Sequence, residues 1–176
     1  MYPFVRMFKE MWRARRMGPV GFFDAHVSHH ICWPWDLDPW MELNNGRTLT
    51  LYDLGRLPFG RRAGVERVLR EKRWGLTVAG STIRYRRRVT VFSKLTMHTR
   101  CVGWDKRFLY MEQSMWREDE CTSHALIRSA VVGKTGIVPP AELVAALGSV
   151  PESPALPSWV QAWIDAEANR PWPPER

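Results

Sequence analysis

Apolar residues recur along the chain with two different periods, and each period predicts a different kind of element. Residues 3–16 carry apolar side chains at helical spacing against basic ones, which predicts a short amphipathic helix. Apolar and polar residues alternate over 24–33, as they do in a strand. A helical pattern then covers about 45–73, and we expect it to break at residues 58–60, where a proline and a glycine flank Phe59.

The second half of the chain has a mostly β-like pattern, with four apolar runs at 76–89, 94–104, 108–117 and 121–133. Short turns separate these runs, whereas a parallel crossover needs a dozen or more residues, so consecutive strands should be antiparallel neighbours. The long helix then has one sheet to bury its apolar side against. This order predicts an α+β domain in which an antiparallel β-sheet wraps around a long central α-helix.

The C-terminal part predicts two short helices, one over residues 139–147 and one that carries Trp159 and Trp163, with a proline-rich linker between them. We therefore divide the chain into three parts: a basic amphipathic N-terminal segment (1–20), the main domain (21–148) and a Pro/Trp-rich tail with a short helix (149–176).

The composition fits one domain. The chain has 176 residues, of which 45% are hydrophobic, enough for a core without disulfides or metals. Cys32, Cys101 and Cys121 are widely spaced, which predicts reduced thiols in a cytoplasmic protein. Neither a signal peptide nor a transmembrane span is expected, because arginines and lysines interrupt the N-terminus and no window is long and apolar enough.

The formal charge of +8 favours anionic partners. Of the 26 basic residues, 21 are arginine, whose guanidinium group forms bidentate hydrogen bonds with phosphate and carboxylate groups. Nucleic-acid binding would suit this charge and the ten tryptophans, but the aromatic residues fall at core spacing and no RNA-binding motif is present. We predict no nucleic-acid partner. The N-terminal helix could contact a membrane surface as a peripheral element, yet packing on the domain or on a partner subunit is favoured for a single helix.

The junction between the first strand and the long helix, residues 35–47, is the main candidate for chemistry. Asn44 or Asn45 can cap the helix, whose unpaired backbone N–H groups then face back towards Asp38. Such a helix start can stabilise an oxyanion. On the local sequence alone, a turn or capping role is favoured for Asp38, which precedes a proline, whereas Asp36 is predicted to be structural.

Two groups of side chains at strand positions need separate interpretations. The predicted strand 76–89 ends in a run of arginines, Arg84, Arg86, Arg87 and Arg88. The alternate residues Arg84, Arg86 and Arg88 should share one strand face, and the run could form either a solvated surface or a clamp for phosphate. The first strand carries His26, His29 and His30, but we predict no metal site there. The neighbours His29 and His30 point to opposite faces of the strand, and no cysteine or carboxylate at ligand spacing completes a set of metal ligands.

Taken together, these motifs resemble the hotdog-fold acyl-CoA thioesterases of the 4-hydroxybenzoyl-CoA thioesterase type, and within them the group similar to thioesterase superfamily member 6. The resemblance covers most of the chain. Its carriers are Asp36-Leu37-Asp38, Asn44-Asn45-Gly46-Arg47, Tyr85-Arg86-Arg87-Arg88, Gly103-Trp104-Asp105-Lys106-Arg107 and Ala125-Leu126-Ile127-Arg128. The resemblance implies a hotdog fold and hydrolysis of an acyl-CoA thioester to free acid and CoA, without a cofactor.

The resemblance also implies roles for individual residues. Asp38 would act as general base or nucleophile, and backbone N–H groups up to Gly46, with the Asn45 side chain, would polarise the thioester carbonyl. Glu42 departs from the pattern, because many relatives carry histidine there; a second carboxylate could orient water or raise the pKa of its neighbour. The resemblance further implies a homo-oligomer, a homodimer or a homotetramer built as a dimer of dimers, with sites between subunits.

Two other functions stay open at this point. A non-catalytic acyl-CoA-binding hotdog protein would explain Glu42 as the mark of a lost site. A hotdog hydratase or dehydratase would use paired acid and base groups, but no histidine near the motif supports it.

Overall fold

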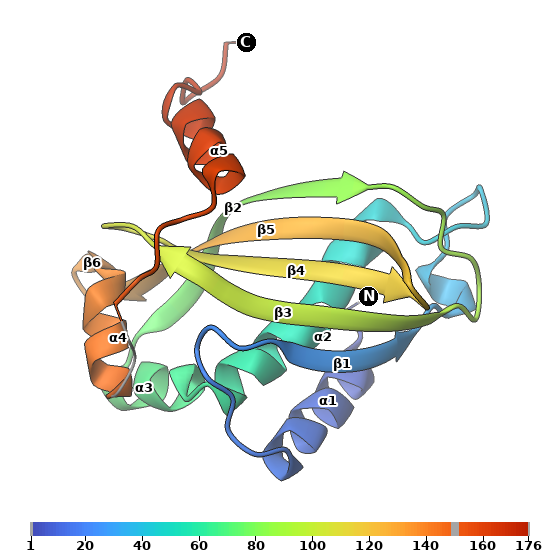
Figure 1. Ribbon diagram of the computed structural model, residues 1–176, viewed down its shortest axis with the longest axis horizontal. Helices are drawn as coiled ribbons and strands as arrows, with labels where there is room; N and C mark the ends of the chain where they lie inside the picture. Colours follow the sequence, from blue (N-terminus) through green and yellow to red (C-terminus); the bar gives the residue numbers. More distant parts are fainter. Residues whose placement is uncertain (1, 149–151, 176) are drawn as a thin grey trace.

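The computed structural model describes residues 2–148 and 152–175, and its centre is one antiparallel sheet (Figure 1). The strand order is β1-β3-β4-β5-β2, with β6 paired to β5. All five pairings between neighbouring strands are antiparallel, as the short connections predict. The strands are β1 (His26–Ile31), β2 (Gly75–Tyr85), β3 (Lys94–Trp104), β4 (Leu109–Arg117), β5 (Glu120–Gly133) and β6 (Gly136–Val138).

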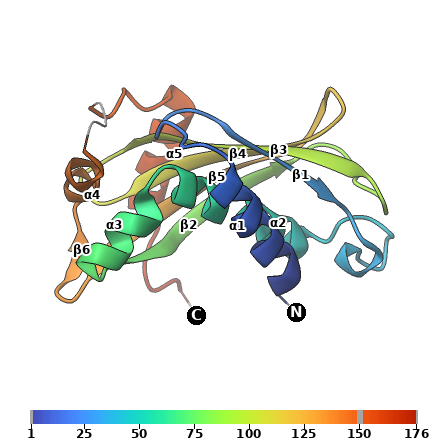
Figure 2. The same cartoon turned by 90° about the horizontal axis from the view of Figure 1, so that it is seen from below.

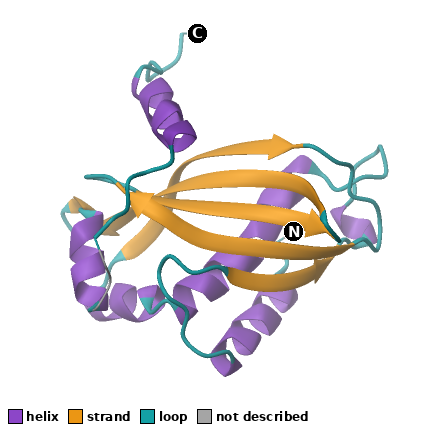
Figure 3. Cartoon of the chain, in the orientation of Figure 1, coloured by secondary structure: helices purple, strands orange, loops and turns teal. Residues whose placement is uncertain are grey.

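Helix α2 (Asn45–Arg62) lies across the concave face of this sheet, and the strands curve around it, as Figure 3 shows by element type. The core between them includes Leu51, Leu54 and Phe59 from α2 with Met97 and Met115 from the sheet, all at most 1% exposed. This arrangement confirms the predicted α+β architecture, an antiparallel sheet wrapped around a long central helix.

The remaining helices lie around this centre. They are α1 (Phe4–Arg16), the 3₁₀ turn η1 (Pro34–Asp36), α3 (Val65–Lys72), α4 (Pro140–Leu147) and α5 (Ser158–Ala168). In the turned view, α1, α2 and α3 lie on one side of the sheet and α5 lies on the other (Figure 2). No helix within residues 2–148 and 152–175 combines the length and apolar character that a membrane crossing requires.

Helix α5 covers part of the outer face of the sheet. Val160 is fully buried there against Val102, Tyr110 and Leu126, which point away from α2. The alternate strand residues Cys101, Met111 and Ile127 belong to the inner core. The two apolar faces of β3, β4 and β5 are therefore both used, one by α2 and one by α5.

Gly55 sets how closely α2 approaches the sheet. A Cβ atom at this position would lie 2.6 Å from Met97 Sδ and 2.7 Å from Thr99 Oγ1. Beside it, the buried Gln113 donates Nε2 hydrogen bonds to Tyr52 O at 2.8 Å and Thr99 Oγ1 at 2.9 Å. The middle of α2 is thereby fixed to β3 and β4, which also determines where its N-terminus lies.

The helical region breaks at a different place from the one expected. Helix α2 continues through Pro58 to Arg62, and the interruption comes at Ala63 and Gly64, where Gly64 adopts φ 81°. Proline removes one hydrogen bond from the helix. Because Pro58 and Phe59 are buried on the core side, packing offsets that loss, and the glycine ends the helix instead.

Strand β2 also ends earlier than the expected strand 76–89. Both Arg86 N–H and Arg87 N–H donate to Thr122 O, at 2.9 and 3.2 Å, so the regular ladder with β5 stops after Tyr85. The prediction that Arg84, Arg86 and Arg88 share one strand face is therefore wrong.

Candidate functional site

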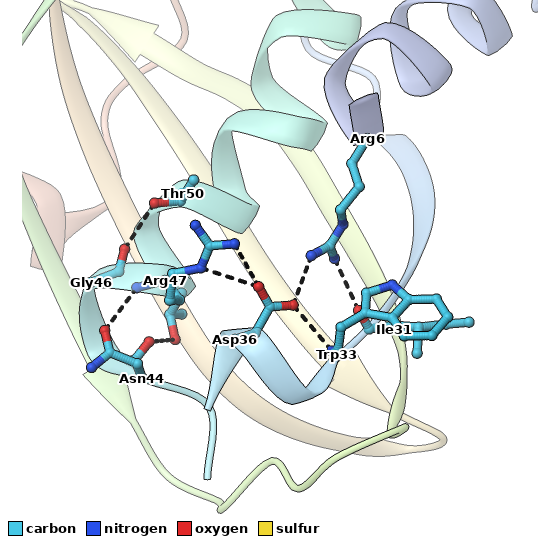
Figure 4. A network of polar contacts seen from close by, with 9 residues as sticks. Arg6, Ile31, Trp33, Asp36, Asn44, Gly46, Arg47 and Thr50 are labelled. Atoms are coloured by element: carbon cyan, nitrogen blue, oxygen red, sulfur yellow. Dashed lines mark hydrogen bonds and ion pairs between the residues drawn. The ribbon is translucent and has the colours of Figure 1, made fainter. Parts of the chain in front are cut away.

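The segment between β1 and α2 is built around the buried carboxylate of Asp36 (Figure 4). Arg6 Nη1 and Arg47 Nη2 each lie 2.7 Å from it, and Trp33 N–H donates at 3.1 Å. Burial alone would raise the pKa of Asp36, but the hydrogen bonds from Arg47, Trp33 and Arg6 outweigh burial and lower it. Asp36 thus has the structural role that the sequence predicts, joining α1, η1 and α2.

The start of helix α2 is capped by Asn44, one of the two predicted caps. Its side-chain oxygen accepts the Arg47 N–H at 3.1 Å, and its carbonyl accepts Thr48 N–H at 2.9 Å. Asn45 and Gly46 form the first turn, whose N–H groups have no acceptor within the helix, and both residues are exposed. These N–H groups and the helix dipole favour a negative charge at this point.

A cavity of about 240 Å³ lies beside this helix start. Asn45 and Thr48 of α2 form one side of it, and the segment that follows β2 forms another. The complete lining is Glu42, Leu43, Asn45, Thr48, Tyr85, Arg86, Arg87, Arg88, Val89, Thr122 and Ser123. Three arginines and a helix N-terminus therefore surround a small hollow, an arrangement suited to an anionic ligand.

Glu42 lines this cavity and is paired with Arg88, whose Nε donates to Glu42 Oε2 at 2.7 Å. That hydrogen bond, the charge of Glu42 and the charge of Asp38 together raise the pKa of the exposed Arg88 guanidinium. The pair brings one carboxylate and one guanidinium to the same wall of the cavity.

Asp38 occupies a tight turn next to this wall. Its Oδ1 accepts the N–H of Trp40 at 2.9 Å and that of Glu42 at 3.4 Å, and its own N–H donates to Glu42 O at 2.8 Å. It is half-buried and does not itself line the cavity as found in this single chain. Asp38 thus fixes the backbone of Glu42, and of these two carboxylates Glu42 is the one that lines the cavity.

The arginines that the sequence groups together separate in the structure. Arg86, Arg87 and Arg88 line the cavity, and Arg87 is also ion-paired with Glu120. Arg84 instead lines a hollow on the outer face of the sheet, to which Arg86 also contributes. The early end of β2 explains this division, because residues beyond Tyr85 leave the strand and turn towards α2.

Sequence reasoning gave no role to several residues that line the cavity. Tyr85 donates a hydrogen bond from its hydroxyl to Asn45 O at 3.3 Å, and burial raises the pKa of this phenol. Ser123 joins the cavity to the core through a hydrogen bond of 2.9 Å with Tyr52. A strand residue 40 positions away from Asn45 has no local signal that could reveal this contact.

A second cavity, of about 430 Å³, lies between α1, the end of α2, α3 and the first residues of β2. Its walls are mostly apolar and include Met7, Met11, Leu69, Leu76 and Val78. A cavity of this size and character lies in the range that accommodates an organic ligand.

Metal-binding geometry is absent from residues 2–148 and 152–175, where no three His, Cys, Asp or Glu side chains gather around one point. Cys32, Cys101 and Cys121 are free cysteines, as predicted, and burial raises the pKa of the Cys32 thiol to about 11. Cys32 is fully buried.

Comparisons with known proteins identify the fold and the family. THEM6 of Drosophila melanogaster is 26% identical over 147 residues, which cover 81% of this chain and 74% of that protein. The structure of YbaW, a probable thioesterase from Escherichia coli, matches with a TM-score of 0.64 and 19% identity, covering 69% of this chain and 95% of that one.

A 1,4-dihydroxy-2-naphthoyl-CoA thioesterase from Synechocystis matches with a TM-score of 0.60 and 6% identity, over 70% of this chain and 95% of that one. These likenesses confirm the hotdog fold expected from the sequence. The family model of the thioesterase-like superfamily matches residues 32–164, which include the whole segment from η1 to most of α5. The chain therefore belongs to the thioesterase-like superfamily.

Proposed function

We propose that this protein is an acyl-CoA thioesterase that hydrolyses an acyl-CoA thioester to a free acid and CoA. The observation that carries the proposal is the exposed first turn of α2, which opens on a cavity lined by three arginines and a carboxylate. Thioester hydrolysis requires a site for the oxyanion, a carboxylate to activate water or attack the carbonyl, and binding groups for the phosphates of CoA.

The helix start would supply the oxyanion site. When a nucleophile adds to the thioester carbonyl, negative charge develops on the carbonyl oxygen, and the N–H groups of Asn45 and Gly46 can donate to it. The Asn44 cap and the Asp36 cluster hold these donors in place before substrate binds. Donors that are already oriented stabilise the transition state without reorganising during the reaction.

Asp38 is the proposed general base or nucleophile. As a base, its carboxylate would take a proton from water while the water oxygen bonds to the acyl carbon; the carbon–sulfur bond then breaks, and protonated Asp38 returns that proton to the CoA sulfur, which leaves as the thiol. Glu42 lies nearer the cavity and would position that water, or share the role of base. Arg88 is ion-paired with Glu42 and would limit repulsion between the two carboxylates.

The arginines at the cavity are the proposed contacts for CoA. Arg86, Arg87 and Arg88 are all exposed at the cavity, so their guanidinium groups can bind phosphate oxygens without first leaving a packed position in the core. Two cavity-lining arginines already have acidic partners, Glu120 for Arg87 and Glu42 for Arg88, and a phosphate would compete with these carboxylates.

A second copy of the chain would complete the site. β2 is an edge strand in which most residues are exposed, so its outer hydrogen-bonding groups can pair with another β2. Antiparallel pairing would bring the Tyr85 end of one strand beside the Leu76 end of the other. The charged cavity of one copy would then lie near the apolar cavity of its partner, which could receive the acyl chain.

The test is hydrolysis of a series of acyl-CoA substrates by the wild type and by Asp38→Asn. Asparagine keeps the Oδ1 acceptor that receives Trp40 N–H, so the turn is preserved while the carboxylate charge is removed. We expect kcat to fall by roughly 100-fold or more, as is typical when a general base is lost. Equal rates for the two proteins would reject the assignment to Asp38.

Glu42→Gln separates the two carboxylates. If Glu42 only orients water, we expect a smaller loss than for Asp38→Asn, with the melting temperature unchanged. Tight acyl-CoA binding without release of CoA by the wild type would instead support a non-catalytic binder. Consumption of an enoyl-CoA with no free thiol would support a hydratase.

A further inference from the structure

Helix α1 has two different apolar faces, and only one of them is covered. Met7 and Ala14 are buried against the domain. Phe4, Val5, Phe8 and Trp12 are 50% to 83% exposed and share the outward face of the helix over a little more than two turns. The sequence expectation that this helix packs on the domain is therefore met on one side, and the outward side needs a separate explanation.

The charges of α1 are arranged around this exposed apolar face. The helix carries five basic residues and one acidic residue, a net charge of +4. Glu10, the acidic residue, is turned inward and only 5% exposed, where Arg13 and Lys9 approach it at 3.2 and 3.5 Å. Arg15 and Arg16 stay exposed, and the Arg16 guanidinium stacks on the Trp12 ring at 3.7 Å.

We infer that α1 is an interfacial helix that docks the protein on the surface of an anionic lipid bilayer. Exposed aromatic and aliphatic side chains flanked by basic residues suit the headgroup region, where rings enter the apolar boundary and arginines meet lipid phosphates. A second copy of the helix is a poorer partner for this face, because the helix keeps a net positive charge even after the Arg6–Asp36 ion pair is discounted, and two copies therefore repel each other.

The position of α1 gives this docking a structural consequence. Met7 and Met11 line the apolar cavity from the same helix that presents Phe8 and Trp12 outward. The docked helix would therefore hold the cavity close to the bilayer. Lipid docking itself does not depend on hydrolysis, so this inference and the proposed function can fail independently.

The experiment measures binding of the full chain to vesicles of phosphatidylcholine, with and without phosphatidylserine, by co-sedimentation. We expect binding to the phosphatidylserine vesicles that weakens as salt concentration rises. The double variant Phe8→Glu/Trp12→Glu should bind at least about tenfold more weakly, because it lacks two apolar side chains that would transfer from water into the bilayer on binding. Arg15→Gln/Arg16→Gln should lose about fivefold for each charge on anionic vesicles.

Trp172→Glu is the matched control, since this tryptophan is 88% exposed but lies outside α1. It should bind vesicles as the wild type does, and the thermal unfolding of all variants should match that of the wild type, because the altered side chains are on the surface. Absence of wild-type binding to phosphatidylserine vesicles would overturn the inference, as would equal binding by Phe8→Glu/Trp12→Glu. It would also be overturned if that variant dissociated an oligomer in the absence of lipid.

Discussion

At the scale of single residues, β1 places three of its polar side chains on the covered face of the strand. His26, Ser28 and His30 are buried, whereas His29 and Ile31 are exposed. Burial and the nearby charges of Arg6 and Lys9 lower the pKa of His30 from an ordinary value of 6.5 to about 3. The period-two pattern predicts that these side chains alternate, but not that the histidines occupy the covered face.

This burial makes stability depend on pH. Below pH 6.5 His30 is protonated in the unfolded chain, whereas in the folded chain it stays neutral until the pH approaches 3. The free energy of unfolding therefore falls as the pH drops from 6.5 towards 3. Between pH 6.5 and 4.5 we expect a loss of about 2 kcal/mol from this residue. Urea unfolding should show a flatter pH profile for His30→Gln, and the exposed-site control His29→Gln should keep the wild-type slope.

At the scale of elements, the position of the α2 N-terminus depends on its cap. The sequence predicts capping by Asn44 or Asn45, and the structure selects Asn44, because its carbonyl also accepts Thr48 N–H and its own N–H donates to Asp36 O. Local sequence identifies a helix start, whereas the contact with the buried Asp36 decides which residue it is.

Removal of this cap should weaken both the fold and the proposed catalysis. For Asn44→Ala we expect a loss of about 1 kcal/mol and a melting temperature lower by about 2–4 °C, measured by calorimetry. Activity should fall further than stability explains, since the first turn would no longer be fixed. Asn44→Ser preserves a capping oxygen and should recover most of both quantities; a serine variant as impaired as the alanine variant would argue against the capping explanation.

At the scale of the whole molecule, β2 forms an edge of the sheet that no other strand within residues 2–148 and 152–175 covers. Arg86 N–H donates to Thr122 O in β5, and alternate residues of an antiparallel strand point the same way, so the N–H groups of Ser81 and Ile83 face this free edge. An exposed edge of this kind favours pairing with a second chain.

Ser81→Pro removes one of these outward donors without disturbing the ladder to β5. We expect the wild type to have the mass of a dimer or a larger even assembly in analytical ultracentrifugation, and the proline variant to shift towards monomer. Ser81→Thr keeps the N–H and serves as the control. An unchanged assembly state for Ser81→Pro would place the contact between subunits elsewhere.

Local periodicity predicts most of the elements here, since each depends on the residues within it. The strand between residues 94 and 104 has the predicted bounds, and the helices α1, α4 and α5 lie where their patterns indicate. The predicted break at 58–60 was wrong because the buried Phe59 stacks on Phe22, a residue far away in the chain. The predicted end of β2 was wrong because Thr122 O accepts hydrogen bonds from two successive N–H groups, those of Arg86 and Arg87.

The sequence by itself therefore determined the kinds of elements, their antiparallel order and the Asp-Asn junction at the start of the long helix, because periodicity, short turns and capping are local properties. The tertiary structure alone decided which arginines meet the helix start, how Arg6 and Arg47 bury Asp36, and which face of α1 stays exposed. Those outcomes depend on contacts between residues far apart in the chain, which no local pattern encodes.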